Sequence, residues 1–478
     1  MYLLSTKNLT IGQVRQKLIS LLLILGAVAL TGTMLVLALP LGEQAWLAWF
    51  MLFPLLWTTK EKGFIVGFLA GLASVFLCAW LSTTGVFYRH KDFESSPAWN
   101  YTACGLYAFS FAIFFAIWAD KKNFLRPVWW LAALAVGLEA ILLIEIPATL
   151  AVTQYRNGLA VGLASIGGIW LTSFVVWYAN VSLAKIEKGT FRWEYLPLAA
   201  LFLGSFIDSG GSASARVQGV IKVGITQIRD GSDEEQAAAH RLASKDAPVF
   251  IVWPEFSGML FVSGDDTSKL QNTSLDSSPL ITSFRDTKIP LPHNVAALFA
   301  KGRESVRYEK RKLFAKEKDM HSPGDRAIAV PIPSVPGAVG LNICFDSCYP
   351  SIIRETASLP DVRVVALPTI DPDSSHYFVA AVHAAYTPFR SAENGVAFVR
   401  ADGHFASMIV NEKGQIVAEL KDEQKAITAN ISGNRTWTLF RVFGDWFLYL
   451  SVILVVFPTF LSGYQKFKSK SQGNSVTH

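Results

Sequence analysis

The sequence predicts a multi-span α-helical membrane protein, with about eight spans, that carries one α/β sandwich domain. Two observations lead to this prediction. The mean hydropathy of the 478 residues is +0.34 and 51% of them are hydrophobic, which is too apolar for an ordinary soluble enzyme. The apolar residues also gather before Phe206 and between Trp437 and Leu461, whereas the stretch between these two regions has a globular composition.

Eight apolar runs are candidate membrane spans, because about 20 apolar residues are needed to cross a bilayer. The second and seventh are short; in order, the runs are residues 18–39, 45–58, 63–83, 99–118, 128–149, 159–184, 195–206 and 443–461. Lysine and arginine gather before the first run, in alternate loops after it, and behind the last run. By the positive-inside rule both termini are cytoplasmic, and seven spans place the polar stretch on the opposite face.

The chain is therefore expected to have four parts. These are a seven-span membrane domain over residues 1–210, an extracytoplasmic catalytic domain over 215–432, a closing span over 437–463 and a cytoplasmic tail over 464–478. The first run is long for a signal-peptide core and lacks an A-x-A cleavage site, so we expect it to remain as a span. Glu139 and Glu145 lie within the fifth run. Glu145 is expected to reach the interface, whereas Glu139 leaves a functional and a structural role equally open.

Charge and cysteine content exclude several classes of protein. The formal charge of +6 comes from basic residues at the ends of apolar runs, with no basic stripe interleaved with aromatics, so nucleic acid binding is not expected. Four cysteines are too few for a disulfide scaffold. No dinucleotide fingerprint or phosphate-binding loop occurs, and no cofactor is expected.

The polar stretch alternates strand and helix patterns. Helices are expected at residues 232–244, 351–358 and 378–392, and strands at 220–226, 249–253, 294–298, 327–332, 340–343, 362–367, 396–400, 406–410 and 416–420. Strands and helices that alternate first and then give way to strands predict an α/β sandwich, with reactive side chains at strand ends where loops open.

Three residues at such strand ends form a possible acid–lysine–thiol catalyst. Glu255 can accept and return protons, Lys310 can stabilise an oxyanion, and Cys344 can hold an acyl group as a thioester. Each alone is ordinary: a capping acid, a surface lysine and a buried structural thiol. We expect the turn after the strand to expose Cys344 and lower the pKa of its thiol, because a helix N-terminus would point at it.

The motifs around these residues resemble the Glu–Lys–Cys motifs of the nitrilase (carbon–nitrogen hydrolase) superfamily. They read Val252-Trp253-Pro254-Glu255, Tyr308-x-Lys310-x-x-Leu313 and Ile343-Cys344-Phe345-Asp346. The apolar parts resemble apolipoprotein N-acyltransferases, in Leu47-Ala48-Trp49-Phe50, Gln154-Tyr155-Arg156-Asn157 and Gly444-Asp445-Trp446-Phe447. The resemblance covers nearly the whole chain and implies that the sandwich is a nitrilase-like α-β-β-α domain.

The resemblance also implies an activity. A phospholipid would donate a fatty acyl chain to Cys344, and the N-terminal amine of a diacylglyceryl-cysteine lipoprotein would take it, with Glu255 moving the protons in a ping-pong sequence. Asp346 matches a position that is acidic in the family and is expected to orient the site. The implied setting is the bacterial cytoplasmic (inner) membrane, with the catalytic domain on the periplasmic side and the protein a monomer.

Two loops depart from the family pattern. Residues 314–318 read Phe-Ala-Lys-Glu-Lys, so Glu317 supplies the family's additional acid only with a one-residue shift. Residues 371–375 read Asp-Pro-Asp-Ser-Ser where the family has a lipid-entry loop. Two alternatives therefore stay open: an amidase or an acyltransferase for another amine, and a catalytically silent membrane scaffold.

Two further features of the polar stretch are assigned structural roles. Cys348 is expected to be a buried free thiol rather than a disulfide partner of Cys344. His376, His383 and His404 show no metal-ligand spacing, so no metal site is expected.

Overall fold

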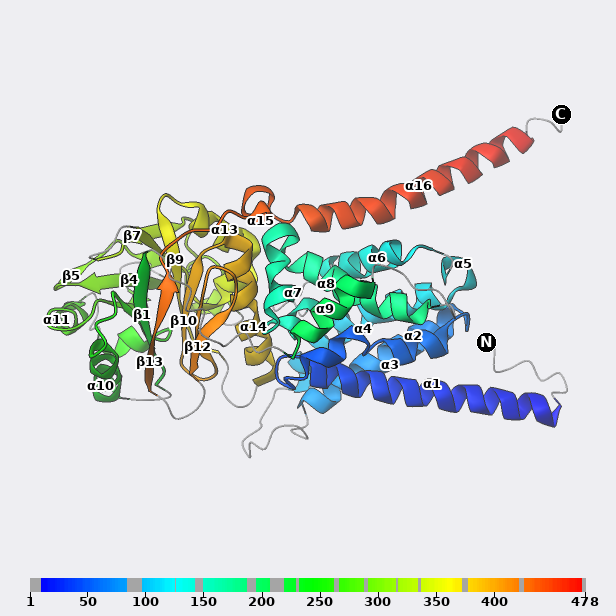
Figure 1. Ribbon diagram of the computed structural model, residues 1–478, viewed down its shortest axis with the longest axis horizontal. Helices are drawn as coiled ribbons and strands as arrows, with labels where there is room; N and C mark the ends of the chain where they lie inside the picture. The colour runs from blue at the N-terminus through cyan, green and yellow to red at the C-terminus, as the bar shows by residue number, and fades with distance from the viewer. Residues whose placement is uncertain are drawn as a thin grey trace.

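The computed structural model joins a helical bundle to a two-sheet sandwich (Figure 1). It describes residues 10–83, 97–124, 126–141, 149–186, 195–206, 219–228, 232–261, 266–287, 291–314, 317–333, 337–371, 377–420 and 425–474. The two longest helices of the bundle, at the two ends of the chain, both extend away from the sandwich (Figure 1).

The bundle contains the described parts of the apolar runs that were expected to form spans. Its elements are α1 (Ile11–Ala38), η1 (Ala45–Trp49), α2 (Phe53–Thr59), α3 (Phe64–Thr83), α4 (Pro97–Ala119), α5 (Lys121–Phe124), α6 (Val128–Ile141), η2 (Leu150–Gln154), α7 (Gly158–Gly162), α8 (Ala164–Ala184), α9 (Tyr195–Gly204) and α16 (Trp446–Asn474).

Three helices in the described part of the chain are long and apolar enough to cross a membrane, so the expected count of eight is not confirmed. They are α1, Phe64–Ser82 of α3, and α8. The described apolar segments Ala45–Thr59, Tyr107–Ala119, Val128–Ile141, Tyr195–Gly204 and Trp446–Phe460 are shorter. The run at 45–58 folds as a 3₁₀ turn and a seven-residue helix, and at 1.5 Å per residue α2 is only about 10 Å long. Residues 142–148, with Glu145, lie outside the described residues.

Glu139 has a complete set of hydrogen-bond donors inside the bundle. Ser173 Oγ and Trp177 Nε1 on α8 donate to its carboxylate, the latter at 2.8 Å, and the Leu150 N–H donates at 3.2 Å. A buried carboxylate with three donors joins α6, α8 and η2, which favours the structural role over the functional one.

The sandwich confirms the expected α-β-β-α fold. One sheet has the order β13-β1-β2-β3-β4-β5, with β6 paired to β4; the other has the order β12-β11-β10-β9-β8-β7. The strands are β1 (Val220–Thr226), β2 (Ile251–Val252), β3 (Leu280–Asp286), β4 (His293–Ala300), β5 (Arg303–Glu304), β6 (Tyr308–Glu309), β7 (Ile328–Pro331), β8 (Ala338–Leu341), β9 (Val362–Thr369), β10 (Ala397–Asp402), β11 (Ser407–Val410), β12 (Ile416–Leu420) and β13 (Ala426–Ser432).

Helices cover the outer faces of both sheets. The helix α10 (Asp233–Ser244) packs on β1, whereas α13 (Pro350–Ser358) and α14 (Tyr377–Asn394) pack on β9 and β10. Shorter elements are η3 (Ser257–Phe261), α11 (Ser268–Thr273), α12 (Glu317–Met320), η4 (Cys344–Cys348) and α15 (Leu439–Phe443). The helix α10 begins as its sequence predicts, because Ser232 accepts from the Glu235 N–H and Glu235 bonds back to the Ser232 N–H.

Two long strands were not predicted from the sequence. They are β3 and β13, which alternate apolar residues with Thr, Ser, Asn and Arg and so show little hydrophobic contrast. The strand β13 pairs antiparallel with β1 over seven residues and becomes the edge of its sheet, while β3 lies between β2 and β4. These segments form strands because they pair with strands that are distant in the sequence. The local pattern of apolar and polar residues contains no information about that pairing.

The helix α14 also joins the sandwich to the bundle. Near its C-terminus Glu393 Oε1 accepts the Ile169 N–H of α8 at 2.9 Å, immediately after a break at Gly168. Gly168 has φ +68°, and a Cβ there would lie 2.6 Å from the Phe440 ring. Glycine is therefore required at this break, which lets Phe440 and Glu393 reach the backbone of α8.

Candidate active site

Glu255, Lys310 and Cys344 come from three strands that end at the same place. Glu255 follows β2, Lys310 follows β6 in the same sheet, and Cys344 follows β8 in the facing sheet. All three side chains are buried. The strand-end positions expected from sequence thus converge between the two sheets.

Glu255 and Lys310 form a buried ion pair. Lys310 Nζ donates to Glu255 Oε1 at 2.8 Å. Asn294 Nδ2 on β4 donates to the same oxygen at 2.7 Å, and the Ile370 N–H donates to Oε2 at 3.1 Å. Burial raises the pKa of Glu255, although the charge of Lys310 opposes this shift. A carboxylate with a raised pKa is a stronger base than an exposed one.

Glu317 gives Lys310 a second carboxylate. Lys310 Nζ donates to Glu317 Oε2 at 2.7 Å, and the Phe314 N–H donates to that oxygen at 2.8 Å. Asn294 Nδ2 reaches Glu317 Oε1 at 3.3 Å, so one amide joins both acids. Burial alone would lower the pKa of Lys310, but the negative charges of Glu255 and Glu317 raise it. The lysine is therefore an ammonium ion fixed between two carboxylates.

Asp346 anchors the turn that carries Cys344. Its carboxylate accepts from the Ile343 N–H at 3.0 Å, from Tyr308 OH at 2.6 Å and from the Lys312 N–H at 2.8 Å. Tyr308 and Lys312 flank Lys310, so Asp346 ties the cysteine turn to the lysine strand. The family resemblance implied an orienting role for Asp346, and these contacts are consistent with that role.

Cys344 occupies a strained position at the start of η4. Its φ is +46°, in the left-handed region that side chains other than glycine seldom adopt. The carbonyl oxygen of Cys344 accepts a hydrogen bond from Ser347 Oγ at 2.8 Å. The thiol of Cys344 points at the carbonyl oxygen of Ile370, with Sγ 3.9 Å from it. The turn brings the sulfur near enough to Glu255 for the charge of this carboxylate to act on the thiol.

The expectation of a lowered thiol pKa is wrong. Burial and then the charge of Glu255 raise the pKa of Cys344 well above its usual range, and Lys310 opposes this only in part. The helix α13 begins at Pro350, six residues later, so no long helix starts at the sulfur. At rest Cys344 is therefore a thiol beside a carboxylate and not a preformed thiolate.

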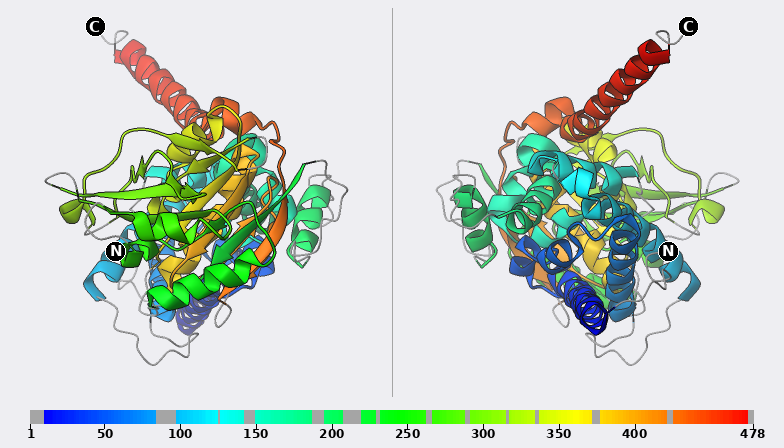
Figure 2. Two further views of the ribbon diagram at one scale, coloured as in Figure 1. Left: turned by 90° about the vertical axis from the view of Figure 1, so that its left-hand side faces the viewer. Right: turned by 90° about the vertical axis from the view of Figure 1, so that its right-hand side faces the viewer.

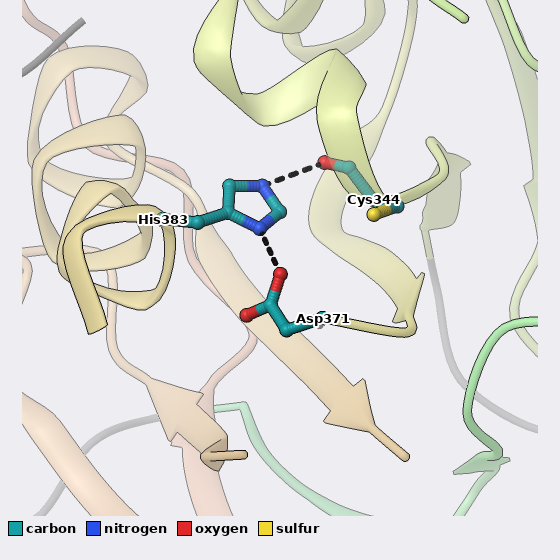
Figure 3. Close-up of side chains that lie close together, drawn as sticks. All are labelled: Cys344, Asp371 and His383. Carbon is teal, nitrogen blue, oxygen red and sulfur yellow. Dashed lines mark hydrogen bonds and ion pairs between the residues drawn. The ribbon is translucent and has the colours of Figure 1, made fainter. Parts of the chain in front are cut away.

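A second buried cluster supports the same turn from the other side and was not predicted. In Figure 3 the imidazole of His383 lies between Asp371 and the backbone of Cys344. His383 Nδ1 is 2.5 Å from Asp371 Oδ1, and Nε2 is 3.2 Å from the Cys344 carbonyl and 2.8 Å from Ser347 Oγ. Arg400 bonds the other oxygen of Asp371.

These partners fix the charge of His383. Burial would lower its pKa, but Asp371 raises it to about 10. As an imidazolium it donates from both nitrogens, to Asp371 and toward Cys344 and Ser347. The sequence held one sign of this cluster: His383 lies seven residues before Arg390, as a histidine does in the family that the chain resembles. That spacing does not show which residues His383 contacts.

The ligating atoms of Cys344, Asp371 and His383 lie within 4.8 Å of one another, as those of a metal site do. Both ring nitrogens of His383 are already hydrogen-bonded, and the Arg400 cation occupies Asp371. A zinc ligand must instead present a free lone pair. This cluster fits an imidazolium better than a metal ion. Cys348 is a free buried thiol, as is Cys344.

The fold and the site define a class: a carbon–nitrogen hydrolase domain joined to apolar helices. The carbon–nitrogen hydrolase family model matches residues 236–437, and the model of the apolipoprotein N-acyltransferase N-terminal domain matches residues 31–182. Among solved structures, a mutant amidase of the nitrilase superfamily from Nesterenkonia AN1 has 20% identity and a TM-score of 0.40, covering 46% of this chain and 94% of that one.

One curated relative matches across most of the chain, and a second matches a shorter part. The apolipoprotein N-acyltransferase of Geobacter metallireducens is 24% identical over 450 aligned residues, with 81% of this chain and 85% of that protein covered. The enzyme of the same name from Thermotoga maritima is 29% identical over 126 residues, about a quarter of each chain. Over both of its parts the chain is therefore similar to apolipoprotein N-acyltransferases, with their N-terminal domain followed by a carbon–nitrogen hydrolase domain.

Proposed function

We propose that this protein moves a fatty acyl chain from a phospholipid to the N-terminal amine of a diacylglyceryl-cysteine lipoprotein. The observation that carries the proposal is the convergence of Glu255, Lys310 and Cys344, in a chain that also carries the N-terminal domain of the family. The relatives named above are apolipoprotein N-acyltransferases.

In the first half-reaction Glu255 takes the thiol proton and Cys344 Sγ attacks the carbonyl carbon of the phospholipid ester. The carbonyl oxygen becomes an oxyanion beside Lys310 Nζ, and the C–O bond to glycerol breaks. Glu255 returns the proton to the leaving alcohol, so lysophospholipid departs and a thioester remains. The raised pKa of Glu255 makes its carboxylate a stronger base toward the thiol. Because the pKa of Cys344 is also raised, the proton leaves sulfur during the attack and not beforehand.

In the second half-reaction the lipoprotein amine attacks the thioester. Glu255 accepts a proton from the attacking nitrogen, the C–S bond breaks, and the thiol of Cys344 is restored as the amide forms. Lys310 meets the same oxyanion in both halves, and Glu317 holds the ammonium in place.

The test separates acyl transfer from hydrolysis. Purified protein is incubated with a phospholipid that carries a labelled acyl chain, and hydroxylamine-sensitive label is sought on Cys344. Label that persists until a diacylglyceryl peptide is added supports the proposal, whereas label lost to water alone indicates an amidase or lipase. Absence of label, with Cys344→Ser indistinguishable from the parent, would indicate a catalytically silent scaffold.

We also propose that the protein lies in the cytoplasmic membrane as a monomer, with the catalytic domain outside and both termini inside. The alternating basic loops and the apolar helices support this topology. Reporter fusions test it: alkaline phosphatase joined within residues 421–424 should be active, and the same enzyme joined after His478 should be inactive. The reverse result would contradict the orientation.

A further inference from the structure

Four arginines, outside the site described above, lie together where the sandwich meets α16. Arg354 Nη1 on α13 donates to the carbonyl of Arg441 at 3.3 Å, and its guanidinium packs on Gly444 at the turn between α15 and α16. Arg435 is close enough to both Arg441 and Arg363 for their charges to repel. We call Arg354, Arg363, Arg435 and Arg441 the arginine cluster.

Nearby carboxylates neutralise the cluster only in part, since Asp445 acts on Arg354 and Asp361 acts on Arg435. None of its four side chains forms an ion pair with any residue in the described ranges. Arg435 Nε is buried without a hydrogen-bond partner, and Arg435 Nη1 reaches only the Leu359 carbonyl, at 3.4 Å. Asp361 is exposed and only partly offsets the charge on Arg435. Burial and the charge of Arg435 lower the pKa of Arg441 to about 10. An anion held among these guanidinium groups would relieve the repulsion.

Apolar and aromatic side chains border the cluster. Trp437 is 67% exposed, Phe443 63% and Tyr449 65%, and Val442 is exposed beside them. These residues lie between Arg435 and the first turns of α16, and Figure 1 shows α15 at the boundary between the sandwich and the bundle. Trp and Tyr favour the level of lipid headgroups, and the apolar segment Trp446–Phe460 follows at once. The cluster therefore lies where the surface of a membrane would meet the protein.

We propose that the arginine cluster binds the phosphate of an anionic phospholipid at the membrane surface. Planar guanidinium groups bond phosphate oxygens in pairs, and basic residues next to a membrane helix attract anionic lipids. The exposed aromatic side chains would contact the same lipid below its headgroup. This assignment does not depend on the acyl-transfer reaction.

Such a lipid would brace the active site from outside. The helix α13, which carries Arg354, follows the Cys344–Cys348 turn directly. Arg441 Nη1 donates to the carbonyl of Asn394, the last residue of α14, which also carries His383. A bound headgroup would thus hold the middle of α13 and the end of α14, the two helices next to the cysteine turn.

The test measures lipid binding by the whole protein in detergent micelles. Native mass spectrometry gives the dissociation constants for phosphatidylglycerol and for phosphatidylcholine with the same chains, with inorganic phosphate as a competitor. The double variant Arg363→Gln/Arg435→Gln removes two charges and spares Arg354 and Arg441, which bond the backbone of the junction. The double variant Arg241→Gln/Arg303→Gln is the matched control, since both residues are exposed. They belong to α10 and β5, which lie away from α15 in Figure 1 and in Figure 2.

The parent is expected to bind phosphatidylglycerol at least tenfold more tightly than phosphatidylcholine. The Arg363/Arg435 variant should bind it about 25-fold more weakly, about fivefold for each arginine, while the control stays within twofold of the parent. If the double variant does not fold, each single variant should show its own fivefold loss. Parental affinity in these variants, equal binding of both lipids, or displacement by equimolar inorganic phosphate would overturn the proposal.

Discussion

Glu317 provides the sharpest test of how the site holds its lysine. The variant Glu317→Gln keeps the shape of the side chain and removes the negative charge that accepts from Lys310 at 2.7 Å and from the Phe314 N–H at 2.8 Å. A hydrogen bond to a charged group contributes about 1.5–3 kcal/mol. If Lys310 needs that bond to stay at the position of the oxyanion, acylation should slow by about 10- to 150-fold.

The assay is single-turnover acylation of Cys344 by a labelled phospholipid, followed as hydroxylamine-sensitive label over time. Asp319→Asn is the matched control: it removes one acidic charge from the same short helix, α12, at an exposed position. The control should acylate at the parental rate. Acylation of Glu317→Gln at that same rate, with the protein folded, would refute the idea that the second carboxylate positions Lys310.

Three further outcomes follow from the geometry. Gly168→Ala should lower the free energy of unfolding by about 2 kcal/mol or more, because the residue has φ +68° and a Cβ there would meet the Phe440 ring. The control Gly162→Ala has open space around it and should change the free energy of unfolding little. Equal effects of the two substitutions on the melting temperature would contradict this. The pKa of His383 is raised to about 10 from 6.5, so its contribution to stability is complete below pH 6.5 and is lost as the pH rises through 10; thermal melts of His383→Gln should lack this loss between those values. Because the pKa of the Cys344 thiol is raised, iodoacetamide should label it more slowly at pH 7 than a free cysteine, with a rate that climbs beyond the usual thiol pKa of about 8.5; fast labelling at pH 7 would contradict the buried thiol.

Much of the sandwich could be predicted because its signals are local. The range predicted for β1, residues 220–226, is the range observed. The helix α10 begins after Ser232, the residue that the sequence predicted as its N-terminal cap. The strands β3 and β13 could not be found in this way, since half of their residues are polar and their pairing partners lie far along the chain. The run at 45–58 was expected to form one span, but it folds as a 3₁₀ turn followed by a short helix. Its apolar composition does not show where the helix breaks.

The same division holds within the site. Glu255, Lys310 and Cys344 could be named because motif spacing puts each at the end of a strand. Glu317 could be suggested only with a shift of one residue. Parts of the two loops that depart from the family pattern, residues 315–316 and 372–375, lie outside the described residues. The structure brings Glu317 to Lys310 because the Phe314 N–H and Asn294 Nδ2 both bond its carboxylate.

The sequence by itself determined which chemistry is present: an acid, an ammonium and a thiol, set between apolar runs that suit a membrane. Only the tertiary structure decided how these groups are tuned. Burial between two sheets raises the pKa of the Cys344 thiol, where the sequence alone had predicted a lowered one, because solvation and the charge of Glu255 are properties of the folded surroundings. The contacts of the His383 imidazolium and of the arginine cluster could likewise not be predicted from the sequence. The residues that make these contacts come from segments that only folding brings together.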